Sequence, residues 1–583
     1  MKFDKETISA FVICVVLLFA WTPICKYFGW IQEEQPRPAV SAPEKSAAPA
    51  ENIVSPATKD KDTAAATNTD APVKPAAAAK AVAAAPAALS IPSQTILNKY
   101  FTMTIDPVSG TVKSVVLDKF LNYAHTGKII LDKNLEPGAL AVFNSKPWKV
   151  LEVIDNNRNS DKSFSVVRKL ADESGNVFLL TQSWNIVDDY TTDYTVSFKN
   201  TGRSELKFQK ISINSGGLQP LLRLAGDTIT TETHCIDFMT AGGKLFDLYA
   251  DAKEKDFFVQ PEEPVTWTGV GNKYFACLLL PEKPFDDGVV QAREETVTAD
   301  NAKYFTAGIG GSYKNIAVAP GKEFTLKFKY YAGPKILKDL KKFDDSSSRI
   351  MHLAWGPLDW VAKFMLVALI MLKGFCGSYG WAIIVLTIIV RVVFWPVTQK
   401  ANNSMKKMQK LQPMVTEIKA KFKDNPQQMN AKVMELYKIE KVNPLGGCLP
   451  ILLQIPVFFA LYATLDGAVE LRQVSFLWAS DLSRPDTIAV IFGLPLNPLV
   501  LVMTALMVLQ QKMTPAPADP MQQKMMMFMP VVMLFVLYSL PSGLTLYWTV
   551  SQVFSILQLY MTQKMGKDQP AADKSQKNSL KKA

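Results

Sequence analysis

The sequence is poor in the residues that build metal centres and disulfide scaffolds. Its 583 residues include three histidines and six cysteines, and no two cysteines are spaced as Cys-x-x-Cys. His234, Cys235 and Cys277 could be drawn as a metal or thiol site, but three such residues without a recognisable spacing are usually ordinary core or surface residues. The composition therefore predicts neither a bound metal ion nor a disulfide framework.

Motifs that carry enzymatic chemistry are also missing. The sequence has no Gly-x-Ser-x-Gly nucleophile elbow, no His-Glu-x-x-His zinc motif and no Gly-x-x-x-x-Gly-Lys-Ser/Thr phosphate loop. By contrast, 48% of the residues are hydrophobic, only 20% are charged, and the mean hydropathy is +0.07. Such an average predicts a membrane protein with several spans. We expect no catalytic residues and no cofactor.

Aromatic residues are absent from residues 35–90, which contain 20 Ala and 8 Pro. This segment buries too little apolar surface to offset the entropy of ordering, so we expect a disordered, extended tether. An apolar run at residues 8–25 precedes it and follows Lys2 and Lys5. A cleavable signal peptide and an uncleaved anchor both fit this run, and the lack of a prompt Ala-x-Ala site favours the anchor.

Residues 91–335 show the period-two alternation that is typical of β-strands. The alternation of apolar and polar residues is clear at residues 194–198 and 324–330. An Asp-Pro-Val-Ser-Gly turn at residues 106–110 separates two further apolar runs. Strands with regular turn signals predict a large antiparallel β-sandwich.

Five apolar runs follow the β domain, and the charges between them predict an orientation. Ten lysines lie in residues 398–444 and six follow Met561, whereas residues 466–492 are acidic or neutral. Because basic loops stay in the cytoplasm, six spans with both termini inside satisfy every loop. Residues 32–377 then lie outside the cytoplasm. The five runs are residues 378–397, 445–465, 493–511, 525–540 and 544–562.

Residues 353–375 compete as a seventh span. They are apolar but contain Asp359, Lys363 and Lys373, and a span here would place the lysine-rich loop outside. We therefore expect an interfacial amphipathic helix that lies along the outer membrane surface.

The lysine-rich loop, residues 398–444, is expected to form a helical hairpin. The break falls at residues 423–426, where Asn425 can cap a helix and Pro426 can occupy its first turn. The charge of the loop could face anionic lipid or attract ribosomal RNA. Methionines in this loop and in the next could adapt to varied apolar partners or simply face lipid.

Carboxylates are absent from all five apolar runs, yet the first of them contains Arg391. At 1.5 Å per residue, Arg391 lies about 9 Å inside the end of its run, where a charge costs roughly 2.5–3.5 kcal/mol. Snorkelling to the headgroups is one solution. The other is a hydrated groove open to the cytoplasm, which uncharged polar residues at similar depth favour. These are Thr387, Gln454, Gln552 and Ser555.

An unpaired cation in a hydrated groove suits an acidic or polar guest that enters transiently. A proton pump would need a titratable carboxylate or histidine, and the apolar runs have neither. Three functions stay open on these residues: an energy-independent insertase and membrane chaperone, a small-solute channel or transporter, and a membrane-anchored glycan-binding protein or enzyme. Partitioning of an incoming apolar segment, at roughly a few tenths of a kcal/mol for each residue, could drive the first.

Several motifs resemble the YidC family of bacterial membrane protein insertases. They are KVNPLGGCLPILLQIPVFFALY at residues 441–462, DPMQQKMMMFMP at 519–530, PSGLTLYW at 541–548, and the intramembrane Arg391. The resemblance covers residues 378–562. The anchor, tether and β domain resemble the Gram-negative branch in architecture. This resemblance implies an inner-membrane protein with a periplasmic β-supersandwich.

The resemblance also implies partners and further site residues. The expected partners are nascent membrane proteins, the ribosome, subunits of the Sec translocon and anionic lipid, with no small-molecule substrate. A client helix is expected to slide along the third and fifth spans, here including Ile455, Pro456 and Phe458. The family usually has two tyrosines where this chain has Tyr547 and Trp548, so one groove hydroxyl is lost.

The predicted fold class is a polytopic α-helical membrane protein with six transmembrane helices and a large all-β periplasmic domain. The predicted divisions are the anchor (1–31), the tether (32–90), the β-sandwich (91–335), a linker with the interfacial helix (336–377), a five-helix core (378–562) and a basic cytoplasmic tail (563–583).

Overall fold

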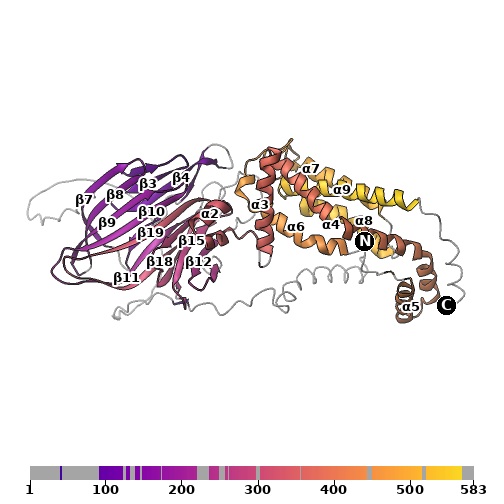
Figure 1. Ribbon diagram of the computed structural model, residues 1–583, viewed down its shortest axis with the longest axis horizontal. Coiled ribbons are helices and arrows are strands. Elements are labelled where there is room, and N and C mark those ends of the chain that lie inside the picture. Colours follow the sequence, from indigo (N-terminus) through magenta and orange to yellow (C-terminus); the bar gives the residue numbers. More distant parts are fainter. Residues whose placement is uncertain are drawn as a thin grey trace, which may run out of the picture. The chain divides into compact units, whose positions relative to one another are not determined.

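The structure is a computed structural model of the full chain. Its contacts distinguish two compact units, one built of strands and one of helices (Figure 1). The predicted anchor lies outside the described residues, as does the tether except for β1 (Val40–Ser41), which pairs with β14 (Phe257–Val259). The described residues are 40–41, 91–122, 127–131, 138–144, 148–172, 174–218, 235–247, 257–259, 261–296, 303–354, 356, 358–440, 442, 449–514 and 520–567.

Antiparallel strands build the first unit in three sheets (Figure 1), which confirms the predicted all-β architecture. The nine-stranded sheet has the order β13-β12-β15-β16-β19-β10-β9-β8-β7, the six-stranded sheet β1-β14-β17-β18-β11-β6, and the four-stranded sheet β2-β3-β4-β5. The strands are β2 (Gln94–Leu97), β3 (Phe101–Asp106), β4 (Thr111–Leu121), β5 (Lys128–Leu131), β6 (Val142–Phe143), β7 (Lys149–Ser160), β8 (Ser163–Ala171), β9 (Val177–Ile186), β10 (Thr191–Asn200), β11 (Leu206–Gly217), β12 (Cys235–Thr240), β13 (Leu245–Asp247), β15 (Val265–Gly271), β16 (Phe275–Pro281), β17 (Asp287–Thr296), β18 (Lys303–Val318) and β19 (Glu323–Pro334).

The two predicted alternating segments form the adjacent strands β10 and β19. Their registers pair Tyr194 with Phe328 and Phe198 with Phe324. In β10 the apolar side chains at positions 194, 196 and 198 are fully buried. Because alternate side chains of a strand point to one face, the sequence pattern places these aromatic rings in the core.

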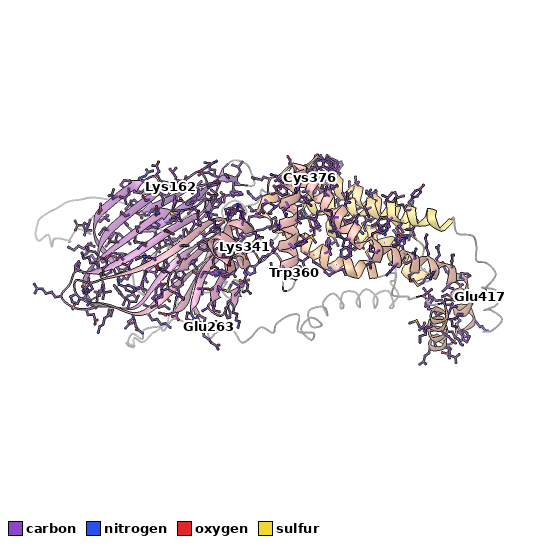
Figure 2. All side chains as sticks on the ribbon, viewed as in Figure 1. Lys162, Glu263, Lys341, Trp360, Cys376 and Glu417 are labelled. Atoms are coloured by element: carbon purple, nitrogen blue, oxygen red, sulfur yellow. The ribbon has the colours of Figure 1, made fainter. Side chains whose placement is uncertain are left out.

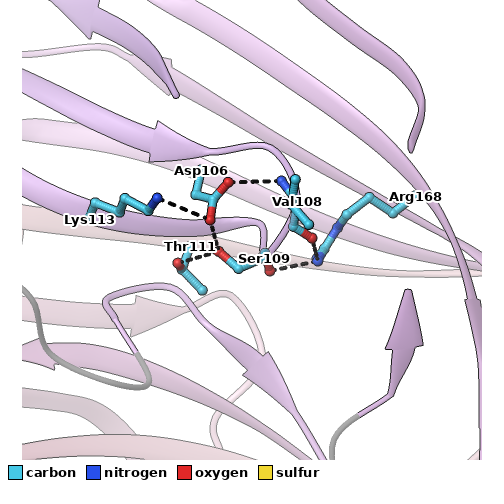
Figure 3. Close-up of polar contacts among 6 residues, drawn as sticks. All are labelled: Asp106, Val108, Ser109, Thr111, Lys113 and Arg168. Atoms are coloured by element: carbon cyan, nitrogen blue, oxygen red, sulfur yellow. Dashed lines mark hydrogen bonds and ion pairs between the residues drawn. The ribbon is translucent and has the colours of Figure 1, made fainter. Parts of the chain in front are cut away.

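The predicted turn at residues 106–110 joins β3 and β4 and is held by its own aspartate (Figure 3). Asp106 Oδ1 accepts from the Val108 backbone N–H at 3.1 Å, and Asp106 Oδ2 accepts from Ser109 Oγ at 3.0 Å. Lys113 Nζ lies 3.4 Å from the same carboxylate. An aspartate that hydrogen-bonds the backbone two residues on is the usual device for such a turn.

A buried arginine fastens this turn to the nine-stranded sheet. Arg168 of β8 is 4% exposed, and its Nη1 donates to the carbonyl oxygens of Val108 and Ser109 at 2.9 and 2.6 Å (Figure 3). Its Nη2 donates to Gln182 Oε1, and Gln182 Nε2 donates to the Gly110 carbonyl at 2.8 Å. Burial lowers the pKa of Arg168 to about 10, so the group stays charged at neutral pH. We name the side chains of Arg168, Gln182 and Tyr194 the turn clamp.

Ten helical segments and one short hairpin make up the described part of the helical unit. The described residues include one helix, α4, that is long and apolar enough to cross a membrane; α7 and Met526–Leu537 are shorter apolar helices. The segments are α2 (Leu337–Phe343), η2 (Asp345–Met351), α3 (Leu358–Cys376), α4 (Tyr379–Lys421), α5 (Pro426–Ile439), α6 (Leu449–Gly467), η4 (Val469–Leu471), α7 (Pro498–Met513), α8 (Pro520–Leu537), α9 (Ser542–Lys567), and the strands β20 (Ala489–Ile491) and β21 (Leu494–Leu496).

Helix α4 does not end at residue 397, the predicted end of the span, but continues to Lys421 through Pro396 and Pro413. The first arm of the helical hairpin is thus an extension of this helix. The second arm is α5, and its predicted cap is confirmed: Asn425 Oδ1 accepts from the Gln428 backbone N–H at 3.1 Å. Pro426 occupies the first turn, as expected.

Helix α3 forms in the segment that competed as a seventh span. One stripe, including Ala362 and Leu366, is fully buried, and Thr464 of α6 donates to the Ala362 carbonyl at 2.9 Å. Trp360, near the start of α3, is 68% exposed, and Cys376 marks its end (Figure 2). Two of the charges within it, Lys363 and Asp359, form an (i, i+4) ion pair at 2.9 Å.

The predicted fourth span at residues 493–511 begins too early. Residues 494–496 form β21, which pairs with β20, and α7 starts only at Pro498. Gly493 has φ +81° and sits in the turn of this hairpin. Proline in the first helical turn marks the true start, because its missing N–H costs nothing there.

Candidate functional site

Arg391 lies in a pocket formed by α4, α6 and α9. The pocket is partly open, and the empty space within it, including open solvent, is about 310 Å³. Arg391, Phe394 and Thr398 follow one another at helical spacing on α4, and Gln454 and Val457 do so on α6. Three side chains named from the sequence therefore share one cavity. The lining residues are Val390, Arg391, Phe394, Thr398, Gln454, Val457 and Tyr547.

The charge in this pocket is uncompensated. In the part of the chain that the structure describes, Arg391 forms no ion pair and donates no hydrogen bond. The polar groups that line the pocket with it, on Gln454, Thr398 and Tyr547, are all uncharged. A guanidinium presents five donors in a planar fork that matches a carboxylate. The pocket can therefore take an acidic or strongly polar group as a transient ligand.

The other side chains predicted for the groove lie outside the pocket lining. Thr387 is fully buried, and its hydroxyl donates to the Ile383 carbonyl at 2.6 Å within α4. Ser555 likewise donates within its own helix, to the Ser551 carbonyl at 2.9 Å. Gln552 is 8% exposed on α9. These helix-internal bonds follow from the habit of Ser and Thr of bonding the carbonyl one turn back.

Trp548 of α9 packs against the part of α6 that carries three residues of the expected client path. The Trp548 indole packs edge-on against Phe458, with 4.9 Å between ring centroids. Ile455 is 37% exposed, and Pro456 is exposed beside it. The three residues expected along the path thus face two ways: Phe458 contacts α9, while Ile455 and Pro456 are accessible.

Thr398 is a pocket residue that the sequence argument missed. Gln558 Nε2 donates to Thr398 Oγ1 at 2.9 Å, and Thr562 Oγ1 donates to Gln399 Oε1 at 3.1 Å. These bonds tie α4 to α9 at one end of the pocket. Helical spacing from Arg391 would have found Thr398, which lies two turns further on the same face.

A second unusual ionisable group lies outside the apolar helices, in η4. Both carboxylate oxygens of Glu470 are buried, and neither accepts a hydrogen bond from another side chain or backbone group that the structure describes. Burial, followed by the negative charge of Asp339, raises the pKa of Glu470 from 4.5 to about 7. A neutral carboxylic acid is therefore favoured in the folded chain.

This shift predicts a pH-dependent stability. Between about pH 4.5 and 7 the folded chain holds a proton that the unfolded chain releases, so the free energy of unfolding falls as the pH rises. The loss is complete about one pH unit above 7, at about 3 kcal/mol. Glu470→Gln should remove this dependence and raise the melting temperature at pH 8. Glu417→Gln, at an exposed position (Figure 2), should leave the dependence unchanged; an unaltered slope in Glu470→Gln would contradict the assignment.

The cysteines considered as a thiol or metal site lie in the β unit. Cys235 of β12 and Cys277 of β16 are both buried as thiols and are not joined by a disulfide. They lie on strands that both pair with β15. His234 lies outside the described residues.

Comparisons with known proteins cover both units. Residues 93–368 match the family model described as YidC periplasmic domain, and residues 371–569 match the model described as 60Kd inner membrane protein. The membrane protein insertase YidC of Pelobacter propionicus is 41% identical over 57% of this chain and 61% of its own length. The YidC insertase of Geobacter sulfurreducens is 36% identical over 65% of this chain and 70% of its own length.

A solved structure is also similar. The crystal structure titled "Active YidC insertase crystal structure with the first transmembrane domain resolved" is 20% identical and covers 81% of this chain and 92% of that chain, with a TM-score of 0.34.

These matches define a bacterial inner membrane protein with a β-rich periplasmic domain and a helical C-terminal part. The chain spans 61% of the length of the first relative and 70% of the length of the second. The chain belongs to the YidC family of membrane protein insertases.

Proposed function

We propose that this chain inserts newly made proteins into the inner membrane and helps them fold there, alone or with the Sec translocon. The observation that carries the proposal is the uncompensated charge of Arg391 in a pocket lined by Gln454, Thr398 and Tyr547. A cation in such a setting attracts the acidic or polar part of a short tail that must cross the membrane. The relatives bear the name of membrane protein insertases, which agrees with this role.

The driving force is the partitioning of the client's apolar segment into lipid. Twenty residues at roughly 0.3–0.6 kcal/mol each give several kcal/mol, enough to draw a short polar tail through a partly hydrated pocket. The chain therefore acts without catalytic chemistry. The pocket shortens the apolar path that the tail must cross, and Arg391 offers it a polar contact on the way.

Side chains next to the pocket are suited to guide the client helix. Ile455 and Pro456 expose apolar surface on α6, and the α8 residues Phe528 and Phe535 are 56% and 76% exposed. Pro456, which lies within α6, removes one backbone N–H donor from the helix at this point. We propose that the client slides along these two helices.

The topology we propose has six spans and both termini in the cytoplasm. The lysine-rich hairpin then faces the ribosome and anionic lipid. Its second arm, α5, has no buried residue, and lysines on both arms are exposed, including Lys407, Lys410 and Lys432. A helix pair with exposed lysines on both arms is suited to an anionic partner.

Site-specific photo-crosslinking tests the proposal. A probe at Ile455 should react with the apolar segment of a ribosome-stalled, single-span client, and only at chain lengths that expose this segment. Val502, 45% exposed on α7, is the matched control and should react weakly. Equal reaction at both positions, or no reaction at Ile455 in a folded and inserted chain, would refute the path.

A further inference from the structure

The hairpin between η4 and α7 exposes apolar side chains on both of its faces. All three residues of β20 are exposed, and alternate residues of a strand point to opposite faces. Val490 is 66% exposed, Ile491 50%, Phe492 101% and Leu494 69%. Residues 487–511 contain no charged side chain. We name residues 488–496 the apolar hairpin.

The tip of the apolar hairpin has an unusual residue for its backbone shape. Ile491 pairs with Leu494, so Phe492 and Gly493 form a two-residue turn with φ of +51° and +81°. Asparagine or aspartate usually occupies the first of these positions, because large side chains are strained at positive φ. A fully exposed phenylalanine there gains nothing for folding in water. Leu477, in the same loop, is a second large apolar residue that is exposed at positive φ: its φ is +54° and its side chain is 68% exposed.

A buried polar network fixes the base of the hairpin. Asp486 Oδ2 accepts from the Leu499 backbone N–H at 2.7 Å and from Trp478 Nε1 at 2.8 Å. Asn497 Nδ2 donates to the Tyr538 carbonyl at 2.8 Å. These hydrogen bonds hold the base of the hairpin in place. The exposure of its apolar tip is therefore a defined part of the structure.

We propose that the apolar hairpin is immersed in the headgroup–acyl boundary of the lipid bilayer, with Phe492 as its deepest side chain. A docked protein would cover one face, whereas lipid surrounds both. Each strand of the hairpin has three residues, so at about 3.3 Å per residue the hairpin is about 10 Å long, similar to the depth at which interfacial segments lie. The outer edges of a two-stranded ribbon carry unpaired backbone groups, which excludes the hydrocarbon centre.

The neighbouring elements agree with this placement. Helix α7 starts two residues after β21 and, with 16 residues, is about 24 Å long, shorter than the roughly 30 Å hydrocarbon core. The hairpin extends the apolar surface of α7, whose Leu501 and Val502 are 41% and 45% exposed. Trp478, 48% exposed with its N–H bonded, suits the interfacial belt where tryptophan gathers. The inference requires membrane residence and is independent of insertase activity.

Photo-crosslinking to lipid tests the immersion directly. The full chain, carrying benzoylphenylalanine in place of Phe492, is reconstituted in vesicles of phosphatidylethanolamine and phosphatidylglycerol, irradiated and weighed by intact mass spectrometry. Positions Phe535 on α8 and Val187 in the β unit serve as lipid-facing and aqueous references. We expect a lipid-adduct yield within about threefold of that at 535 and about tenfold above that at 187. A yield equal to that at 187 overturns the proposal, as does a mass increase of a second protein chain.

A second variant separates immersion from folding. Phe492→Asn keeps the left-handed turn, because asparagine tolerates positive φ, and removes the apolar side chain. With the probe at Ile491, this variant should lose about threefold or more of the lipid adduct at an unchanged or higher melting temperature. An unchanged adduct yield overturns the role of Phe492. Insertion of clients is measured in parallel, so failure here leaves the proposed function standing.

Discussion

Replacing Arg391 with alanine is expected to reduce the insertion of a client with a short acidic tail by about 10- to 100-fold. A hydrogen bond to a charged group contributes about 1.5–3 kcal/mol, and each 1.4 kcal/mol is tenfold in an equilibrium. The other pocket residues are uncharged and cannot replace this attraction. Protease protection of the client tail in proteoliposomes measures the yield.

The fold should survive this change. Among the described residues Arg391 forms no hydrogen bond or ion pair, so alanine leaves no hydrogen-bonding group without its partner. Arg391→Lys should keep most of the activity, because the charge is retained. Lys400→Ala, at an exposed position on the same helix, is the matched control and should insert normally. Equal loss in the Ala and Lys variants would show that the planar fork, rather than the charge, is required.

The charge of the client gives a sharper version of the test. If Arg391 acts by attraction, neutralising the tail should lower insertion by the wild-type chain and should have little further effect in Arg391→Ala. A double-mutant cycle over chain and client isolates this coupling. Additive losses would mean that Arg391 serves the pocket's shape or hydration, and the attraction argument would fail for this chain.

The β unit could be predicted from the sequence because its signals are local. Alternation at residues 194–198 and the Asp-Pro-Val-Ser-Gly turn directly fix strand and turn. The helical unit was harder, because a hydropathy run marks apolar composition and not the helix end. Thus α4 passes through Pro396 into a polar arm, and an apolar run at residues 488–496 is a hairpin. Sheet order was beyond the sequence, since strand pairing over long separations leaves no local pattern.

The candidate site shows the same division. Arg391 could be singled out because a charge in an apolar run needs a reason, and Gln454 and Tyr547 join it in the pocket. Depth along a span does not reveal which face a side chain occupies. Thr387 shows this, because it is one turn from Arg391 and yet buried away from the cavity. Rotation of each helix depends on tertiary packing, which a single sequence does not display.

Replacing Arg168 with methionine should have the largest effect on stability in the β unit. The guanidinium donates to the carbonyls of Val108 and Ser109 and to Gln182 Oε1, and methionine supplies no donor. Leaving buried acceptors unpaired costs about 1–3 kcal/mol each, so we expect a loss of about 3–5 kcal/mol. Pulse proteolysis of the purified full chain in increasing urea, followed through its β-unit fragments, measures it. Lys162→Met, an exposed change at the start of the β8 hairpin (Figure 2), should stay within about 0.5 kcal/mol.

The pH profile distinguishes the clamp from an ordinary titration effect. Burial lowers the pKa of Arg168 to about 10, so the group is charged in both the folded and the unfolded chain below that pH. The difference between wild type and Arg168→Met should therefore be constant between about pH 6 and 9. A difference that changes across this range would assign the effect to another group.

The turn clamp should also behave as one unit. Gln182 Nε2 donates to the Gly110 carbonyl at 2.8 Å and to the Tyr194 hydroxyl at 2.5 Å, and the same side chain accepts from Arg168. Removing either Arg168 or Gln182 leaves the other without their shared hydrogen bond. The double variant should therefore lose less free energy of unfolding than the sum of the two single losses, by about 1–3 kcal/mol. Additive losses would mean that the two side chains support the turn separately. Gly110 adds a steric reason for the coupling: a Cβ there would lie 2.0 Å from Gln182 Oε1. The turn closes against the clamp only because this position has no side chain.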